Sequence, residues 1–149
     1  MTTSEPNVAR SGRIVVGIDG SPPSLDALRW AGRQAELTGS SLEVIITWEW
    51  PNNYGWGMPF PPDYRPDEDM RKVLDKAIST ALADRPDLVI IRRVVQGHPA
   101  PCLVEASKGA DLLVVGNRGH GEFVGMVIGS VSEHCASSAH CPVLVYRDE

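Results

Sequence analysis

The residues best suited to chemistry lie in one glycine-rich stretch, residues 116–130, which reads GNRGHGEFVGMVIGS. Glycine adopts positive φ and allows close approach, so successive N–H groups can point toward one anion. Ser130 then begins a predicted helix and either caps it or donates to a phosphate, and a helix N-terminus attracts negative charge. The stretch therefore predicts a polyphosphate cradle, which draws on the following residues: Gly116, Arg118, Gly119, His120, Gly121, Gly125, Gly129 and Ser130.

Two better-known nucleotide-binding patterns do not fit this chain. G-x-x-x-x-G-K-[ST] occurs nowhere, and G-x-G-x-x-G does not follow the first predicted strand. These observations disfavour a P-loop NTPase and an ordinary dinucleotide-binding domain. A mobile surface turn is the alternative for any glycine-rich loop, and the position of this loop directly after a buried strand favours ligand binding.

Strands and helices alternate along the chain. Short apolar runs predict strands at 13–18, 42–48, 88–95, 112–116 and 142–146. Helical spacing predicts a helix that starts after Ser21 as N-cap and stops at Gly39, one that Pro86 ends, and two more at 100–109 and 130–138. This order predicts an α/β, Rossmann-like fold with a parallel sheet covered on both faces. Ligands bind at the carboxyl ends of such strands, here at loops 17–21 and 116–130.

Composition bounds the class of protein. A chain of 149 residues, 42% hydrophobic, fits one domain, expected at 13–149 after a flexible segment at 1–12. The net charge of −5 disfavours nucleic-acid binding. No apolar run is long enough for a signal peptide or a membrane span, and three cysteines suit reduced thiols, so a cytoplasmic location without membrane contact is expected.

Three separated motifs resemble the universal stress protein family. Gly116, Gly119, Gly129 and Ser130 match G-x2-G-x9-G-[ST], which ATP-binding members carry. VVGIDGS at 15–21 is similar to the family's opening strand and aspartate, and CPVLVYR at 141–147 to its closing strand. The resemblance implies an open five-stranded sheet of order 3-2-1-4-5, ATP as ligand, with Mg²⁺, and a homodimer formed through the last strand, 142–146.

The resemblance also implies roles for single residues. Asp19 matches the acidic residue near ribose and adenine, Gly17 and Ile18 line the pocket, and Thr47 or its neighbour Ile46 packs against adenine. Asn117 replaces a serine common in related sequences, in a loop that works mainly through its backbone. The remaining matches lie beside the base and ribose, at Val115 and Gly116, or around the triphosphate, at Gly119, Gly129, Ser130, Val131 and Ser132.

Other residues allow competing interpretations. His134, Cys135, His140 and Cys141 suggest zinc, but adjacent helical residues point about 100° apart, so no protein metal site is expected. His98 is a turn residue or a ligand contact. The proline-rich and aromatic-rich stretch 49–66 is an irregular packed loop, or a lid or partner surface.

Three functions remain open at this point. The first is a regulatory module in stress response, in which ATP stabilises one conformation or dimer and so signals to an unknown regulatory protein partner. The second is a slow ATPase, although no lysine or paired carboxylate is fixed near Asp19 in sequence, so no catalytic residue is assigned. The third is a dimeric scaffold that binds no nucleotide.

Overall fold

The computed structural model describes residues 12–49, 65–117 and 129–147. The predicted flexible segment 1–12 lies outside them except for Gly12, as does most of 49–66. The helices and strands, in chain order, are β1 (Arg13–Ile18), α2 (Pro22–Thr38), β2 (Ser41–Trp48), α3 (Pro66–Ala81), β3 (Ile90–Gln96), α4 (Pro99–Ala106), β4 (Leu112–Gly116), α5 (Ser130–Ser138) and β5 (Val143–Tyr146).

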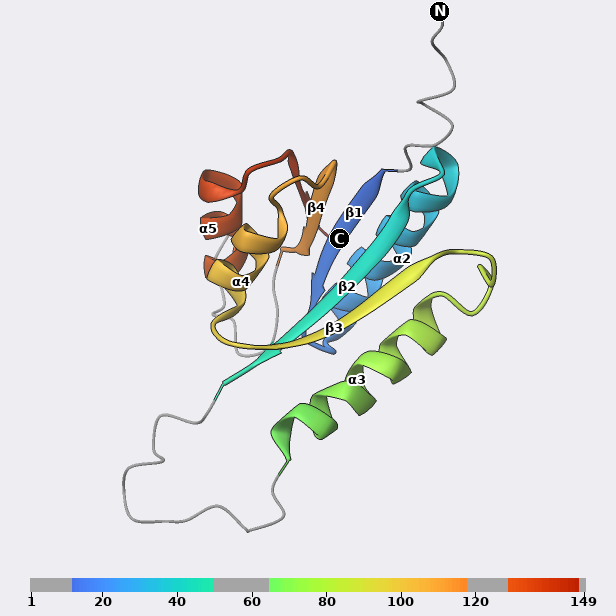
Figure 1. The fold of residues 1–149 in the computed structure, drawn as a ribbon, viewed down its shortest axis with the longest axis horizontal. Helices are drawn as coiled ribbons and strands as arrows, with labels where there is room; N and C mark the ends of the chain where they lie inside the picture. The colour runs from blue at the N-terminus through green and yellow to red at the C-terminus, as the bar shows by residue number, and fades with distance from the viewer. Residues whose placement is uncertain (1–11, 50–64, 118–128, 148–149) are drawn as a thin grey trace, which may run out of the picture.

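The five strands form one parallel sheet of order β3-β2-β1-β4-β5 (Figure 1). This order and the α/β class confirm the predicted fold. The order reverses at β1, which pairs with β2 on one side and with β4 on the other. The carboxyl ends of β1 and β4 therefore lie next to each other, at the point where the strand order reverses.

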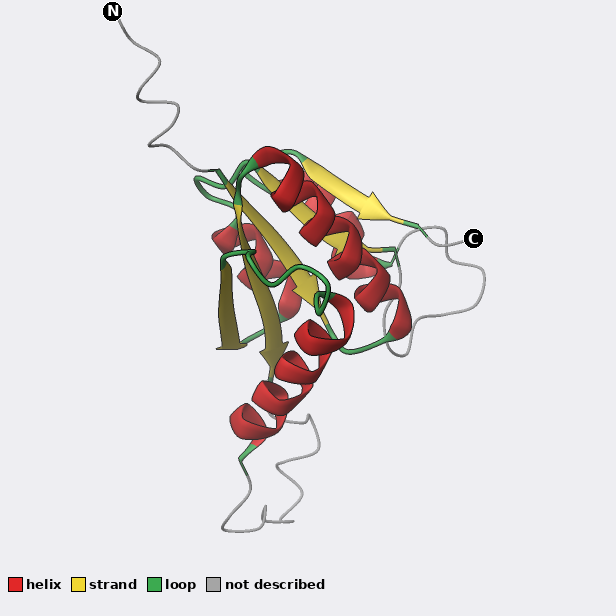
Figure 2. Ribbon diagram, turned by 90° about the vertical axis from the view of Figure 1, so that its right-hand side faces the viewer, coloured by secondary structure: helices red, strands yellow, loops and turns green. Residues whose placement is uncertain are grey.

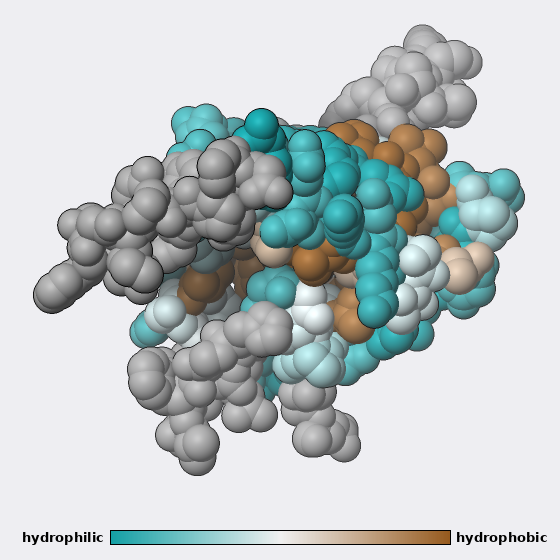
Figure 3. Space-filling model, turned by 90° about the horizontal axis from the view of Figure 1, so that it is seen from below, coloured by the Kyte–Doolittle hydropathy of each residue, from teal (hydrophilic) through white to brown (hydrophobic). Residues whose placement is uncertain are grey.

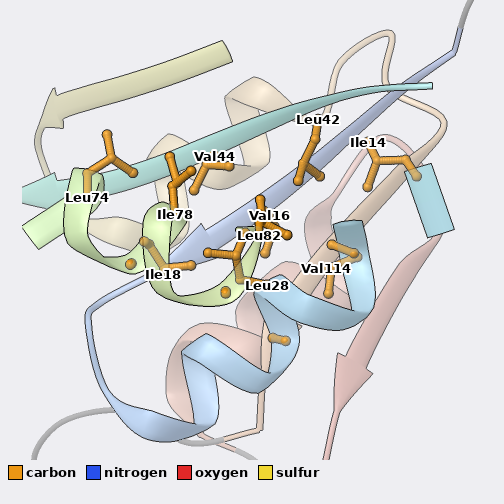
Figure 4. Close-up of a cluster of buried hydrophobic side chains, with 14 of the residues drawn as sticks. Ile14, Val16, Ile18, Leu28, Leu42, Val44, Leu74, Ile78, Leu82 and Val114 are labelled. Atoms are coloured by element: carbon orange, nitrogen blue, oxygen red, sulfur yellow. The ribbon is translucent and has the colours of Figure 1, made fainter. Parts of the chain in front are cut away.

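Helices cover both faces of the sheet (Figure 2). On one face, α2 and α3 pack against alternate residues of β1, β2 and β4, and Figure 4 shows Leu28, Leu74 and Ile78 meeting Val16 and Val44 there. On the other face, α4 and α5 cover a smaller cluster built from the intervening strand residues. The two clusters hold the strands from both sides and so fix the positions of their carboxyl ends.

Coverage by helices is incomplete at β3. Its central residues Ile91, Arg92 and Arg93 are exposed, because β3 is a sheet edge and α4 contacts β2 and β1. On that side Glu43 of β2 is buried beneath two arginines, with Arg13 Nη1 and Arg93 Nη1 each 2.7 Å from one of its carboxylate oxygens. Charged side chains thus replace an apolar layer at this corner.

The ends of three helices differ in detail from the sequence prediction, and one of them, α4, spans Pro99–Ala106 where 100–109 was predicted. Helix α3 ends at Ala81, so Pro86 lies beyond a short turn and does not terminate it. Ser21 does occupy the N-cap of α2, with Pro22 at the first helical position, but its side chain makes no capping hydrogen bond. Gly39 ends α2 as predicted, with φ of 70°.

In the described residues, no helix combines the length and the apolar character needed to cross a membrane.

Candidate functional site

The carboxyl ends of the strands point downward in Figure 1, and Figure 3 views that end of the molecule directly. Apolar surface is visible there within a hollow among mostly polar residues. The structure brings residues 17–19 of β1 and its loop beside residues 115–117 of β4, since Val16 pairs with Val114 in register. The two loops chosen from the sequence therefore share one edge of the sheet.

Asp19 is held in a fixed orientation at the end of β1. Its Oδ1 accepts hydrogen bonds from the Ser21 N–H at 3.0 Å and from Ser21 Oγ at 2.5 Å. The Asp19 N–H donates to Ser24 Oγ at 3.4 Å, and Ser24 Oγ donates to the Ser21 carbonyl. Ser21 therefore orients the carboxylate instead of capping α2, and the Asp19 residue remains exposed at this edge.

Gly17 and Ile18 have structural roles that the sequence did not indicate. A Cβ at Gly17 would lie 2.6 Å from Cδ1 of Leu103, so glycine at this position leaves room for the Leu103 side chain of α4 against β1. The side chain of Ile18 is buried in the cluster beneath α2 and α3. Only the backbone of these two residues is available to a ligand.

The structure separates Thr47 from Ile46 as candidates for the base. Ile46 is 1% exposed and belongs to the core under α2 and α3. Thr47 is half-buried and, because side chains alternate along a strand, lies on the α4 side with Ile45. Of the two residues, Thr47 is the one with accessible surface for a ligand.

The end of β4 is joined directly to the start of α5. The Asn117 N–H donates to the Tyr146 carbonyl at 2.7 Å, which extends the β4–β5 ladder beyond Gly116. The Asn117 carbonyl accepts from the Gly129 N–H at 2.8 Å. Val115, 3% exposed, packs in the cluster under α4 and α5, so the strand side of the loop is rigidly placed.

The N-cap of α5 is Gly129, so the prediction that Ser130 might cap this helix is wrong. Ser130 is the first helical residue and is exposed, which leaves its hydroxyl free of a capping role. Ser132 is buried and its Oγ donates to the Gly129 carbonyl at 2.9 Å, while Val131 packs against the core. This helix start presents backbone N–H groups toward the same edge as Asp19.

The side chain of Asn117 carries the most informative feature of this edge. Asn117 is 9% exposed, and its Oδ1 is the buried side-chain oxygen without a hydrogen-bond partner in the described part of the chain. Sequence reasoning assigned this residue a backbone role, and asparagine in place of serine was the one available signal. The other predicted loop residues, Arg118, Gly119, His120 and Gly121, lie outside the described residues.

Of the competing residues, His98 lies at the carboxyl edge of the sheet, after β3. His98 occupies the N-cap position of α4, although its side chain makes no capping hydrogen bond. The side chain is exposed, and its Nδ1 lies 2.7 Å from Glu49 Oε2. Burial raises the pKa of the Cys135 thiol to about 11, and burial also raises the pKa of Cys102 and Cys141. Within the described ranges, no three His, Cys, Asp or Glu side chains gather as metal ligands would.

A second hollow lies at the opposite, amino-terminal end of the sheet. Gly12, Gln34, Asp111 and Leu112 are among the residues lining it. The N–H of Arg13 donates to Asp111 Oδ2 at 2.8 Å beside this hollow. It shares no residue with the edge that carries Asp19 and Asn117.

Comparison with known proteins agrees with the geometry. The universal stress protein family matches residues 11–147. Universal stress protein Rv1996 of Mycobacterium tuberculosis is 38% identical over an alignment of 152 positions. The alignment covers 96% of this chain and 47% of that protein. The chain thus spans about half the length of the curated relatives it matches.

Solved structures show the same fold. A universal stress protein crystallised in complex with cAMP has a TM-score of 0.67 and 31% identity, with 90% of this chain and 94% of that chain covered. An Archaeoglobus fulgidus universal stress protein in complex with dAMP has a TM-score of 0.63 at 19% identity, with 91% and 97% covered, a likeness of fold alone.

A parallel sheet of order β3-β2-β1-β4-β5, a glycine-rich loop between β4 and α5, and a family match over residues 11–147 lead to one conclusion. This chain belongs to the universal stress protein family.

Proposed function

We propose that this chain binds ATP at the shared edge of β1 and β4 and acts as a nucleotide-responsive regulatory module in stress response. The observation that carries the proposal is the convergence of Asp19, Asn117 and the start of α5 at one edge of the sheet. Complexes of family members with cAMP and dAMP support a nucleotide as the ligand class.

The site offers groups of the right kind for each part of a nucleotide. Asp19 supplies an oriented acceptor for ribose hydroxyls, and Thr47 a partly exposed surface for the base. The N–H groups of Ser130, Val131 and Ser132 open a helix whose dipole favours phosphate, and Gly129 forms its N-cap with an N–H that already donates to the Asn117 carbonyl. We assign the backbones of Gly17 and Ile18 to the lining of the site, and Val115 and Gly116 to the surroundings of the base and ribose. The rest of the loop that we assign to the site comprises Asn117, Arg118, Gly119, His120 and Gly121.

Mg²⁺ enters the proposal as a partner of the phosphates. In the described residues, the carboxylates near this edge include Asp19, whose Oδ1 already accepts from Ser21, and Glu133 in the first turn of α5. One such oxygen-donor side chain suits the way Mg²⁺ is commonly held, mainly by phosphate and water. The proposed site therefore needs ATP to recruit the ion.

Thermal unfolding with and without Mg-ATP tests the proposal. At about one hundred times the dissociation constant, ligand adds roughly 2.7 kcal/mol to the free energy of unfolding, which raises Tm by several degrees. Gly129→Val tests the location, because Gly129 has φ of −67°, a backbone that valine also adopts. We expect this variant to fold and to lose the shift.

Ser138→Val is the matched control, since Ser138 is exposed at the far end of the same helix. It should keep the full shift. If nucleotide-free wild-type protein is folded and shows no shift with Mg-ATP, the proposal fails. An equal shift in Gly129→Val would place ATP elsewhere on the molecule.

We further propose a homodimer formed through residues 142–146 and a cytoplasmic location with reduced cysteines. Strand β5 is an edge of the sheet, and an apolar edge strand is prone to pair with another chain. The carbonyls of Pro142 and Tyr146 accept from β4, so the N–H of Val145 points outward. Val145→Pro should yield monomers in sedimentation analysis if two β5 edges pair, whereas a dimer of unchanged stability would exclude this interface.

A further inference from the structure

The side-chain oxygen of Asn117 is buried and unpaired at the edge where we propose that nucleotide binds. Its residue is nine-tenths buried, and Oδ1 has no hydrogen-bond partner, unlike every other buried side-chain nitrogen or oxygen among the described residues. An orphaned buried acceptor destabilises a folded protein, because its hydrogen bonds to water are lost without replacement. Such an atom calls for a physical reason.

The surroundings of Asn117 explain why the chain itself does not pair this oxygen. The residue's N–H and carbonyl are tied to Tyr146 and Gly129, so its backbone cannot shift to bring a donor closer. Side chains alternate along a strand, which places residue 117 on the same side as Val115, next to the start of α5. The nearby hydroxyl of Ser132 already donates to the Gly129 carbonyl.

The chemistry of the atom limits what can satisfy it. A carboxamide oxygen accepts hydrogen bonds and donates none, so its partner must carry an N–H or O–H group. Ionised phosphate oxygens are acceptors only. Within a nucleotide, the donors are the ribose hydroxyls and the exocyclic amine of the base. The oxygen therefore suits the nucleoside and is unsuited to the phosphates.

We infer that Asn117 Oδ1 accepts a hydrogen bond from a donor on the nucleoside part of the bound nucleotide, which makes residue 117 a specificity-determining residue of the site. This inference rests on the proposed nucleotide-binding function and adds a side-chain role to a loop otherwise expected to act through its backbone. A site built to accept a hydrogen bond rejects analogues that lack the donor, because its buried oxygen is then left unpaired.

Asn117→Leu removes the oxygen and keeps a similar side-chain size. Isothermal titration should compare this variant with the wild type against four ligands: ATP, 2′-deoxy-ATP, 3′-deoxy-ATP and purine riboside triphosphate, which lacks the 6-amino group. We expect wild-type protein to bind one of the three analogues about tenfold or more weakly than ATP, as for a lost hydrogen bond to a buried group. The affected analogue identifies the donor.

In Asn117→Leu the same discrimination should disappear. The variant should bind ATP as weakly as wild-type protein binds the affected analogue, while its affinity for that analogue stays the same or rises. Its thermal unfolding without nucleotide should occur at the wild-type temperature or higher, since an unpaired buried group has been removed. Asn117→Ser, which withdraws the oxygen by shortening the side chain, should give the same loss of discrimination if the leucine variant folds poorly.

Three results would overturn the inference. Discrimination that is unchanged in both variants would mean that bound water alone satisfies the oxygen. An equal loss of affinity for all four ligands would indicate a structural role or a phosphate contact. If wild-type protein binds ATP and all three analogues with equal affinity, the site does not recognise a hydrogen-bond donor of the nucleoside. Failure of wild-type protein to bind any of the four is a different result, since it overturns the proposed function itself.

Discussion

Glu43 and Asn117 are both buried polar residues on the side of the sheet that α4 and α5 cover, but they differ in their hydrogen-bond partners. Both carboxylate oxygens of Glu43 are paired, at 2.7 Å from Arg13 and 2.7 Å from Arg93. Asn117 Oδ1 has no hydrogen-bond partner among the residues that the structure describes. Glu43 lies near the amino ends of the strands, whereas Asn117 lies at their carboxyl ends. Glu43, away from the candidate site, is thus paired within the protein, whereas the Asn117 oxygen within the site is not.

The two cases have opposite consequences for stability. A buried charge needs partners, and Arg13 also donates to the carbonyls of Ala106 and Lys108, so Glu43 belongs to a network joining β1, β2, β3 and the end of α4. An unpaired acceptor has no stabilising role in the folded chain. The comparison therefore separates a residue that serves the fold from one that serves binding.

The largest effect is expected from Glu43→Leu. This change leaves two arginines without their carboxylate, and removing one partner of a fully buried pair costs about 3–5 kcal/mol. Because the side chains of Arg13 and Arg93 are 28% and 46% exposed, water offsets part of this cost. We expect the free energy of unfolding to fall by roughly 2–3 kcal/mol, measured by urea unfolding. A loss under about 0.5 kcal/mol, the size of an ordinary surface substitution, would show that the paired Glu43 does not stabilise the fold.

Arg13→Met and Arg93→Met form a matched pair of smaller effect. Arg13 is the more buried and makes three side-chain hydrogen bonds, whereas Arg93 reaches Glu43 from the exposed edge strand. We expect about 2 kcal/mol of destabilisation for Arg13→Met and under about 1 kcal/mol for Arg93→Met. The same urea titration ranks them, and equal losses would show that burial does not set the strength of these pairs.

Asn117→Leu is expected to change stability least of these substitutions, and in the opposite direction. Without nucleotide, the free energy of unfolding should stay constant or rise by up to about 1 kcal/mol, because an unpaired oxygen is replaced by apolar atoms. Chemical unfolding of nucleotide-free protein measures this directly. Destabilisation as large as that of Glu43→Leu would mean that Asn117 serves the fold after all.

Cys135 adds a third case to this comparison, a buried thiol whose pKa is shifted by burial without a charged partner. Its folded pKa is raised to about 11 from an ordinary value of 9.0, so the neutral thiol is favoured in the folded protein. This contribution is fully present below pH 9 and is lost as pH rises from 9 to 11. At neutral pH the contribution is therefore fully present, and none of it has been lost.

The measurement is the free energy of unfolding across that pH window. It should decline in wild-type protein, and the decline should be shallower in Cys135→Ala, even though this variant starts from a lower value. Parallel curves for the two proteins would show that the Cys135 thiolate does not contribute. Cys102 and Cys141, which are partly exposed, are present in both proteins and cancel in the comparison.

Much of the fold could be predicted because its signals are local. Leu112–Gly116 and Ser130–Ser138 have the predicted bounds, since each depends on the apolar pattern and breakers within a few residues. The end of α3 at Ala81 was missed because a proline limits a helix without fixing where its last turn unwinds. The edge of the sheet that holds the candidate site was also predicted, because ligands bind at the carboxyl ends of parallel strands, while the strand order itself came from the family resemblance.

The side-chain details of the site could not be predicted in the same way. Thr47 and Ile46 are adjacent, and only packing under α2 and α3 decides which one keeps accessible surface. Ser21 has the pattern of a helix cap, yet its hydroxyl bonds to Asp19. The reason for glycine at position 17 is Leu103, which lies 86 residues away (103 − 17) on α4.

The sequence by itself determined the alternation of strands and helices, the parallel sheet and the two loops at its carboxyl edge, because these depend on periodicity and turn residues close together in the chain. The tertiary structure alone decided that Glu43 is paired and that Asn117 Oδ1 is not. Whether a polar atom is buried, and whether a donor reaches it, depends on segments far apart in sequence, such as β1 and β3 around Glu43 or β5 and α5 around Asn117.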